Sequence, residues 1–299
     1  MKYRILILIL LMTTACSTST NSLVSWGNEF VEIEPFFDKE QLACAHNSEL
    51  SWRSSIQGDE LRIEPREFET LKLPARLTVL MEKLGARKFR IGSKLLTTGE
   101  RHSELGNPNA ASAFLELESG WIVGFNLGEF GGGLWWVDNE GNGQKLSYEN
   151  IHDIFWNGDN IIVTTGLAHL SLDGGSLLEF KDRGDQEPLL LREIKSPSSI
   201  EEISTFESGW VAATFLGPVF ININGEVRYN GAAVFRGPNV IYPNSISVDD
   251  QGAVYISGRY ATAIYRNAPD DFSPSWLVSK KCTRFTPDER KIDCTCIAE

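Results

Sequence analysis

The residues that most often carry enzyme chemistry are few in this sequence and follow no known catalytic spacing. The four histidines are His46, His102, His152 and His169. Asp153 follows His152 directly, and such a carboxylate can orient the imidazole of a general base. The sequence contains neither G-x-S-x-G nor H-E-x-x-H, so no nucleophile or zinc motif accompanies this pair. We therefore interpret the histidines as structural or surface residues and predict no catalytic residue.

A glycine-rich stretch, EFGGGLWWVDNEG, provides a candidate ligand-contact loop. Consecutive glycines let a backbone approach another group closely, and a loop of this kind could grip a ligand or a protein at the mouth of a β domain. The alternative is packing, with Trp135 and Trp136 buried on opposite faces of one strand. The residues of the candidate loop are Glu129, Phe130, Gly131, Gly132 and Gly133.

The charge balance argues against nucleic acid as a partner. The 299 residues include 40 acidic and 28 basic residues, for a formal net charge of −12. Such a field repels phosphate backbones. The acidic pairs Asp249-Asp250 and Asp270-Asp271 could suggest acid–base or Ca²⁺ chemistry, but we interpret them as solvated turns at strand ends.

A repeat indicates which elements position these residues. The tetrapeptide ESGW ends at Trp121 and again at Trp210, 89 residues later. The same order of features, namely a turn, an apolar run, a second apolar run and an Asp/Asn-Gly turn, recurs twice more. Aligning Trp121, Asn160, Trp210 and Ala253 gives spacings of 39, 50 and 43 residues, so the two tryptophans are two periods apart. A period near 44 residues with paired strands is typical of β-propeller blades.

We therefore predict an all-β protein, a β-propeller with a short N-terminal helix. The runs IIVTT, VFINI and AVYIS are rich in β-branched and aromatic residues. The length after Cys16 would allow about six blades, with five or seven possible, although four are legible. LSWRSSIQGDELRIEP, residues 50–65, predicts a strand pair.

One segment of the N-terminal third has helical spacing. Leu77, Leu80, Met81 and Leu84 follow an i, i+3, i+4, i+7 pattern, and Gly85 is a stop signal. The pattern predicts a short amphipathic helix packed on the β domain. Alternatively, its apolar stripe could bind a partner helix.

The fourth repeat unit carries a family resemblance. PNSISVDDQGAVYIS, from Pro243 to Ser257, resembles the consensus of NHL and gluconolactonase-type propellers, and the other three units resemble it loosely. Gluconolactonase-like propellers hold a divalent cation on their axis with carboxylates and asparagines, which implies Ca²⁺ binding and a metal-ligand role for Asn244. The sequence departs from that family at Gly258, where an Asp is expected. The alternative is that Asn244 is a turn-forming side chain.

The N-terminus resembles a bacterial lipoprotein leader. Lys2 and Arg4 precede the apolar run from Ile5 to Met12, and Cys16 follows two threonines and an alanine. The resemblance implies cleavage before Cys16, acylation of its thiol, and membrane attachment through the lipid. Ser17 resembles the sorting signal for the outer membrane, which implies a periplasmic location. The alternative is a plain signal peptide with an incidental cysteine.

Export would place the remaining cysteines in a compartment that permits disulfides. Cys44, Cys282, Cys294 and Cys296 allow three connectivities. A turn at Pro287-Asp288 would fold the C-terminus into a hairpin and bring Cys282 near Cys294, which would leave Cys44 for the remaining cysteine. A metal site at Cys294-x-Cys296 is the alternative.

These features predict five segments and a non-catalytic role. The segments are a signal peptide (1–15), an acylated Cys and tether (16–27), an N-terminal region with one helix and one or more poorly legible blades (28–112), propeller repeats (113–281) and a disulfide-stapled hairpin (282–299). We expect a lipid-anchored envelope protein that binds a protein partner or an envelope ligand and needs no cofactor. An immunity-type inhibitor and an accessory factor are specific forms of this expectation. The alternative is a divalent-metal hydrolase or lactonase.

Overall fold

The computed structural model describes residues 30–33, 51–58, 60–66, 71–85, 89–91, 94–96, 110–169, 172–230, 242–259, 261–279, 285–286 and 291–292. The predicted leader and all five cysteines, Cys16, Cys44, Cys282, Cys294 and Cys296, lie outside these residues. Lipidation and the disulfides therefore stay predictions. In the part of the chain described, no helix is long and apolar enough to cross a membrane.

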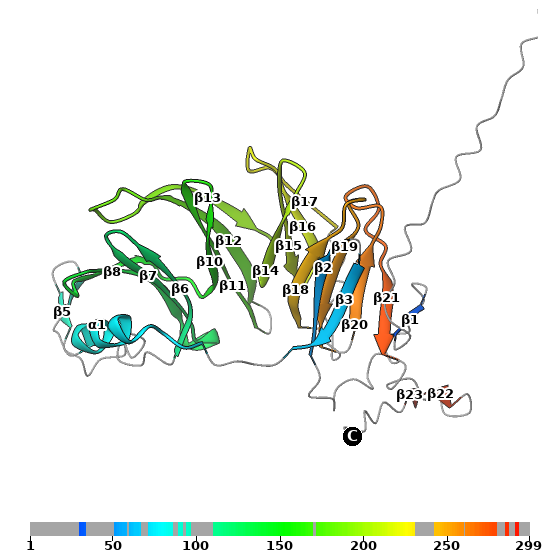
Figure 1. Ribbon diagram of the computed structural model, residues 1–299, viewed down its shortest axis with the longest axis horizontal. Helices are drawn as coiled ribbons and strands as arrows, with labels where there is room; N and C mark the ends of the chain where they lie inside the picture. The colour runs from blue at the N-terminus through cyan, green and yellow to red at the C-terminus, as the bar shows by residue number, and fades with distance from the viewer. Residues whose placement is uncertain are drawn as a thin grey trace, which may run out of the picture.

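Four antiparallel sheets follow one another along the chain and lie side by side, with their strands in sequence order (Figure 1). The first two sheets contain β6 (Ala111–Leu117), β7 (Gly120–Asn126), β8 (Gly132–Asp138) and β9 (Gly143–Ser147), then β10 (Ile151–Asn157), β11 (Asn160–His169), β12 (Leu172–Lys181) and β13 (Leu189–Ser196). The last two contain β14 (Glu202–Phe206), β15 (Gly209–Thr214), β16 (Gly217–Ile221) and β17 (Val227–Tyr229), then β18 (Pro243–Val248), β19 (Val254–Gly258), β20 (Ala261–Tyr265) and β21 (Ser275–Ser279).

Apolar contacts between consecutive sheets produce the propeller arrangement. Ile122 and Ile161 belong to the cluster between the first two sheets. Ile162 and Trp210 belong to the cluster between the second and third, and Val254 lies in the cluster between the third and fourth. Because each sheet buries both faces in this way, the predicted all-β propeller is confirmed. The described residues form four four-stranded repeat units, so the total of six blades stays a prediction.

The two ESGW tryptophans occupy equivalent places in the first and third sheets. Trp121 pairs with Glu116 and Trp210 with Thr205, each one step beyond a two-residue turn. Both side chains are almost fully buried, at 3% and 6% exposure. The 89 residues between them are therefore two structural periods, as the repeat predicts.

The alignment is wrong by one residue in the other two units. Asn160 pairs with Asn157 directly across the turn, so the equivalent of Trp121 in that sheet is Ile161. Ala253 likewise precedes the equivalent residue, Val254, which pairs with Val248. In the fourth unit, a three-residue turn between Asp249 and Ala253 replaces the two-residue turn of the other units and explains the shift there.

The outer face of the first sheet is covered by α1 (Ala75–Gly85), as predicted. Leu77, Leu80, Met81 and Leu84 are at most 6% exposed, and they pack with Trp121 and other residues of that sheet. The stripe is thus occupied within the chain. The alternative of a partner helix on this stripe is wrong.

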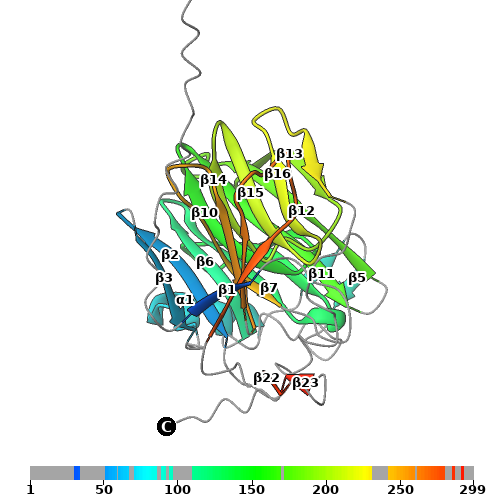
Figure 2. The same ribbon diagram turned by 90° about the vertical axis from the view of Figure 1, so that its right-hand side faces the viewer.

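A strand pair covers the far face of the last sheet. β2 (Trp52–Gln57) and β3 (Glu60–Pro65) form the predicted hairpin, and Leu61 packs against Tyr255 and Leu277. β1 (Phe30–Ile33) pairs with β21 and gives this sheet a fifth strand. Figure 2, a view turned by 90° from Figure 1, shows β1, β2 and β3 beside the last sheet.

The first strands of the sheets lie next to one another on the inner side. β6 contacts β10, β14 contacts β18, and β18 contacts β2. Shorter pairs are formed by β4 (Phe89–Ile91) with β5 (Lys94–Leu96), and by β22 (Phe285–Thr286) with β23 (Lys291–Ile292). The polar side chains of the inner strands therefore converge from several sheets, although they are far apart in the sequence.

Replacing Leu77 with Ala should lower the free energy of unfolding by about 3 kcal/mol, because the truncation leaves a cavity under the first sheet. Val79, on the same helix, is 48% exposed. Its replacement by Ala should change stability by less than about 0.5 kcal/mol. Urea denaturation measures both. Equal effects would contradict the packing of α1 on the sheet.

Candidate functional site

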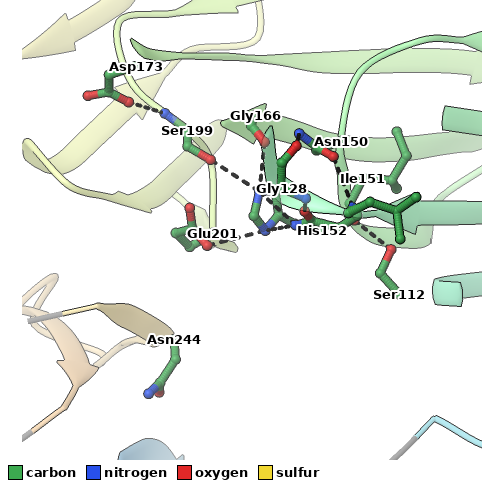
Figure 3. Close-up of polar contacts among 12 residues, drawn as sticks. Ser112, Gly128, Asn150, Ile151, His152, Gly166, Asp173, Ser199, Glu201 and Asn244 are labelled. Atoms are coloured by element: carbon green, nitrogen blue, oxygen red, sulfur yellow. Dashed lines mark hydrogen bonds and ion pairs between the residues drawn. The ribbon is translucent and has the colours of Figure 1, made fainter. Parts of the chain in front are cut away.

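His152 lies at the start of β10 and ties the second sheet to the third (Figure 3). Its Nδ1 is 3.2 Å from Glu201 Oε2, and its Nε2 is 3.1 Å from both Ser199 Oγ and the Gly166 carbonyl oxygen. The two side chains of the ion pair are 14% and 19% exposed. Asn126 approaches the same ring from β7.

The group resembles a serine–histidine–carboxylate triad in distance, but its serine is closed off from any substrate. Gly166 offers Nε2 of His152 a second oxygen besides the Ser199 hydroxyl. Ser199 is also fully buried. We therefore assign His152 a structural role, as a clamp between two sheets.

Asp173 holds the segment that carries Ser199. One carboxylate oxygen accepts the backbone N–H of Ser199 at 2.9 Å and the hydroxyl of Ser198 at 2.8 Å. On the other side, Ser112 of β6 donates to the Ile151 carbonyl at 2.6 Å. These contacts, from the first two sheets and the connection before β14, fix the backbone around His152 (Figure 3).

Two inner carboxyl groups, Asp153 and Glu202, have perturbed acidity. Burial raises the pKa of Glu202 to about 7, and the nearby Asp153 adds to the effect, while Arg66 and Arg53 oppose it. Burial also raises the pKa of Asp153, against the hydrogen bond from the Ile154 N–H. A carboxyl group with a pKa near neutrality can hold or release a proton under physiological conditions.

The structure places Asn244 at the start of β18, beside β2. Its side-chain amide donates to Ser51 Oγ, and its backbone carbonyl accepts from Arg66 Nη1 at 2.9 Å. The Oδ1 atom is buried without a hydrogen-bond partner. It therefore offers one free oxygen ligand.

A hard cation such as Ca²⁺ needs about six to eight oxygen ligands. Among the residues that the structure describes, no group of three or more His, Cys, Asp or Glu side chains could hold a metal ion. The guanidinium of Arg66 at the backbone of Asn244 also disfavours a cation. The described surroundings of Asn244 therefore do not fit the metal site that the family resemblance implies.

A cavity of about 460 Å³ opens where β7 leads to β8 and β11 leads to β12. We call it the mouth cavity. It is lined by the 3-10 turn η3 (Gly128–Phe130), the connection from β9 to β10, the β11–β12 hairpin and the end of β13. The cavity thus lies between the first two sheets.

The candidate loop predicted from the sequence borders this cavity. Glu129 and Gly131 line it, and Phe130 between them is 84% exposed. Gly131 has a φ of 104°, which favours glycine. A Cβ on Gly132 would lie 2.6 Å from the Phe125 carbonyl oxygen, so this glycine serves packing. Similarly, a Cβ on Gly133 would meet the Lys145 side chain at 2.6 Å.

Asn150 holds the loop in place from the next sheet. Its amide nitrogen donates to the Gly128 carbonyl at 3.0 Å, and its Oδ1 accepts the Leu127 N–H at 3.2 Å. Glu129 Oε2 lies 3.0 Å from Nε2 of His169, at the end of β11. These contacts fix the loop against the second sheet.

An ion-pair network forms one wall of the mouth cavity. Lys195 contacts Glu193, and its Nζ lies 3.4 Å from Glu149 Oε1. Glu149 also accepts from Thr165. The hydrogen bond between Lys195 and Glu193 raises the pKa of the lysine and lowers that of the glutamate, despite the opposite effect of burial.

Sequence reasoning missed most of the residues that the fold brings to these two sites. Ser199 and Glu201 follow His152 by 47 and 49 residues, in a connection between sheets that carries no recognisable motif. The segment SPSSIEEI does contain serines and acids just before a strand, and that is the one signal that could have drawn attention to it.

Comparisons with known proteins find distant structural likenesses. No family model and no curated protein matches this sequence. The extracellular domain of a hybrid two-component system from B. thetaiotaomicron is 12% identical, with a TM-score of 0.34, over 63% of this chain and 24% of its own. The computationally designed Ika4 protein is 13% identical, with a TM-score of 0.33, and the match covers 54% of this chain and 92% of the designed protein.

A protein described as a gluconolactonase is 12% identical, with a TM-score of 0.28, over 53% of this chain and 70% of its own. This chain spans about a quarter of the two-component domain that it matches. The likenesses are too distant to assign a family or an activity.

The raised pKa of Glu202 predicts a pH-dependent loss of stability. The folded state keeps a proton that the unfolded state releases, so the free energy of unfolding falls as the pH rises from about 4.5 to about 7 and stays lower above that. Glu202→Gln removes this effect. The difference in free energy of unfolding between the variant and the wild type should therefore shift in favour of the variant from pH 4.5 to pH 8, by an amount on the order of 2 kcal/mol.

Urea denaturation of both proteins at the two pH values measures this gain. Glu140→Gln, at an exposed carboxylate, serves as the control. A difference between Glu202→Gln and the wild type that is the same at both pH values would contradict the assignment.

Proposed function

We propose that this protein is a non-catalytic binding protein of the bacterial cell envelope, and that it holds its ligand in the mouth cavity. One observation carries the proposal. The loop predicted from the sequence lines, through Glu129 and Gly131, a cavity that lies between two adjacent sheets. Cavities of about 300–1,000 Å³ are typical of ligand sites, and this one falls within the range.

Exposed aromatic side chains at the cavity support binding. Phe130 is 84% exposed and Tyr148 is 63% exposed, and Tyr148 lines the cavity. Large rings left in contact with water at a concave site are common in recognition surfaces. The loop that carries Phe130 is held by side chains of the second sheet, so the surface is formed before a ligand arrives.

The proposal is preferred to a hydrolase for two reasons. The described surroundings of Asn244 do not fit a cation, and Ser199 beside His152 is fully buried. The envelope address rests on the lipoprotein-like leader that ends at Cys16.

Filling the mouth cavity should abolish ligand capture. A Cβ added to Gly174 meets no atom within 4 Å, and Gly174 lines the cavity, so Gly174→Phe should occupy the space without disturbing the fold. Gln251→Phe, in the exposed turn between β18 and β19, is a size-matched control. We expect immobilised wild type and Gln251→Phe to retain the same material from solubilised envelopes, measured as bound protein and bound carbohydrate. Equal retention by Gly174→Phe would contradict the proposed site.

The anchor is tested separately. Cys16→Ser should move the protein from the membrane fraction to the soluble fraction, because it removes the thiol to which the lipid is attached. Ser17→Ala keeps that thiol and should leave the protein in the membrane. Failure of the wild type to incorporate labelled palmitate would refute the proposed address.

A further inference from the structure

The charged side chains that line the mouth cavity already have partners. Glu129 contacts His169 at 3.0 Å, and Glu149 contacts both Lys195 and Thr165. The Lys195 ammonium has three nearby acceptors: Glu193, Glu149, and Ser176 Oγ at 3.2 Å. Three carboxylates therefore share one ammonium and one imidazole, so the wall repels an anionic ligand, and a ligand that paired with any of these groups would have to displace an existing partner.

The same network suits a ligand that can both donate and accept. Carboxylates accept hydrogen bonds and an ammonium donates them, and here both kinds of group lie next to each other at the cavity wall. Glu149 is 36% exposed and Lys195 is 69% exposed, so water reaches both. A hydroxyl group can insert into the 3.4 Å contact between Lys195 and Glu149, accepting from the ammonium and donating to the carboxylate. Adjacent hydroxyls can repeat this without any change in charge.

Tyr148 adds an apolar surface to this polar wall. Lys145 Nζ lies 4.5 Å from the centroid of its ring, which fixes the ring through a cation–π contact. The ring is nevertheless 63% exposed and lines the cavity. A held aromatic ring beside paired donors and acceptors can pack against the C–H face of a cyclic polyol.

Glycines of the β11–β12 hairpin, namely Gly166, Gly174 and Gly175, form another part of the cavity lining. Gly174 pairs with Leu167 across the β11–β12 ladder, and both line the cavity. Gly175 needs to be glycine because a Cβ would lie 2.2 Å from the Thr165 carbonyl oxygen. Gly174 has no such requirement. A Cβ on Gly174 would meet no atom within 4 Å, so a side chain can be added at this edge of the cavity.

We propose that the mouth cavity binds a neutral, polyhydroxylated ligand, a sugar ring of a glycan, with Tyr148 against the ring and the Glu149–Lys195 pair on its hydroxyls. This inference rests on the proposed function, because it names the chemical class of the ligand at the same site.

Calorimetric titration of the purified full chain tests this inference. The probes are neutral di- and trisaccharides built from glucose, galactose, mannose and N-acetylglucosamine, at up to about 10 mM, enough to detect a Kd of about 1 mM. A glucuronic acid disaccharide and trilysine represent anionic and cationic ligands. We expect at least one neutral saccharide to bind, with little change in Kd between about 0.05 and 0.5 M NaCl.

Variants identify the site. Tyr148→Ala should weaken binding about tenfold by removing the ring, whereas Tyr148→Phe keeps the ring and should stay within about twofold of the wild type. Gly174→Phe should abolish binding, and Gln251→Phe should not change it. Circular dichroism and melting curves of the four variants check that each is folded.

Three results would overturn the inference: no neutral saccharide binds, a charged probe binds in preference, or binding survives in Gly174→Phe. Its failure can be told apart from failure of the proposed function. If wild type retains envelope material that Gly174→Phe loses, but no saccharide binds, the mouth is a binding site for another class of ligand. If both assays are negative, the proposed function fails as well.

Discussion

The need to bury both faces of every sheet determines this structure. A four-stranded sheet with apolar residues on both sides cannot be stable in water, so each one lies between two neighbours. Strand β11 illustrates the constraint, since Ile161 faces the first sheet and Ile162 faces the third. At the two ends of the series, α1 and the β2–β3 hairpin replace the missing neighbours. The N-terminal segment therefore completes the core at both ends.

This stacking also explains where the polar groups meet. Side chains at sheet ends approach their counterparts in the next sheet, so a histidine at the start of β10 reaches the segment before β14. The mouth cavity has the same origin, because it forms between hairpins of adjacent sheets. Its wall is held by Asn150 and His169, which come from the second sheet and bind the loop of the first.

The parts of the fold that depend on local spacing could be predicted. The apolar positions of α1 and the turn before Trp121 are defined by residues a few positions apart, and the sequence predicts both. The loop at Glu129 was identified because a run of three glycines is locally unusual. The turn before Val254 was misjudged by one residue because it has a different length.

The polar clusters could not be predicted, for a physical reason. Glu202 acquires its high pKa from burial and from Asp153, 49 residues earlier, and neither influence is written in the residues beside it. Ser199 and Glu201 meet His152 because two sheets pack at one particular angle and register. A single sequence contains no direct record of that packing. By contrast, the propensity of a helix or a hairpin lies in the segment itself.

The pairing of β1 with β21 has a mechanical consequence. The chain enters the described fold along the outer edge of the last sheet, where Phe30 faces Ser279 and Ile33 faces Trp276 in an antiparallel ladder. The mouth cavity lies between the first two sheets, at the other end of the series. Tension transmitted from a surface through the N-terminal segment would thus load the β1–β21 hydrogen bonds first. The third sheet would separate the mouth cavity from that force.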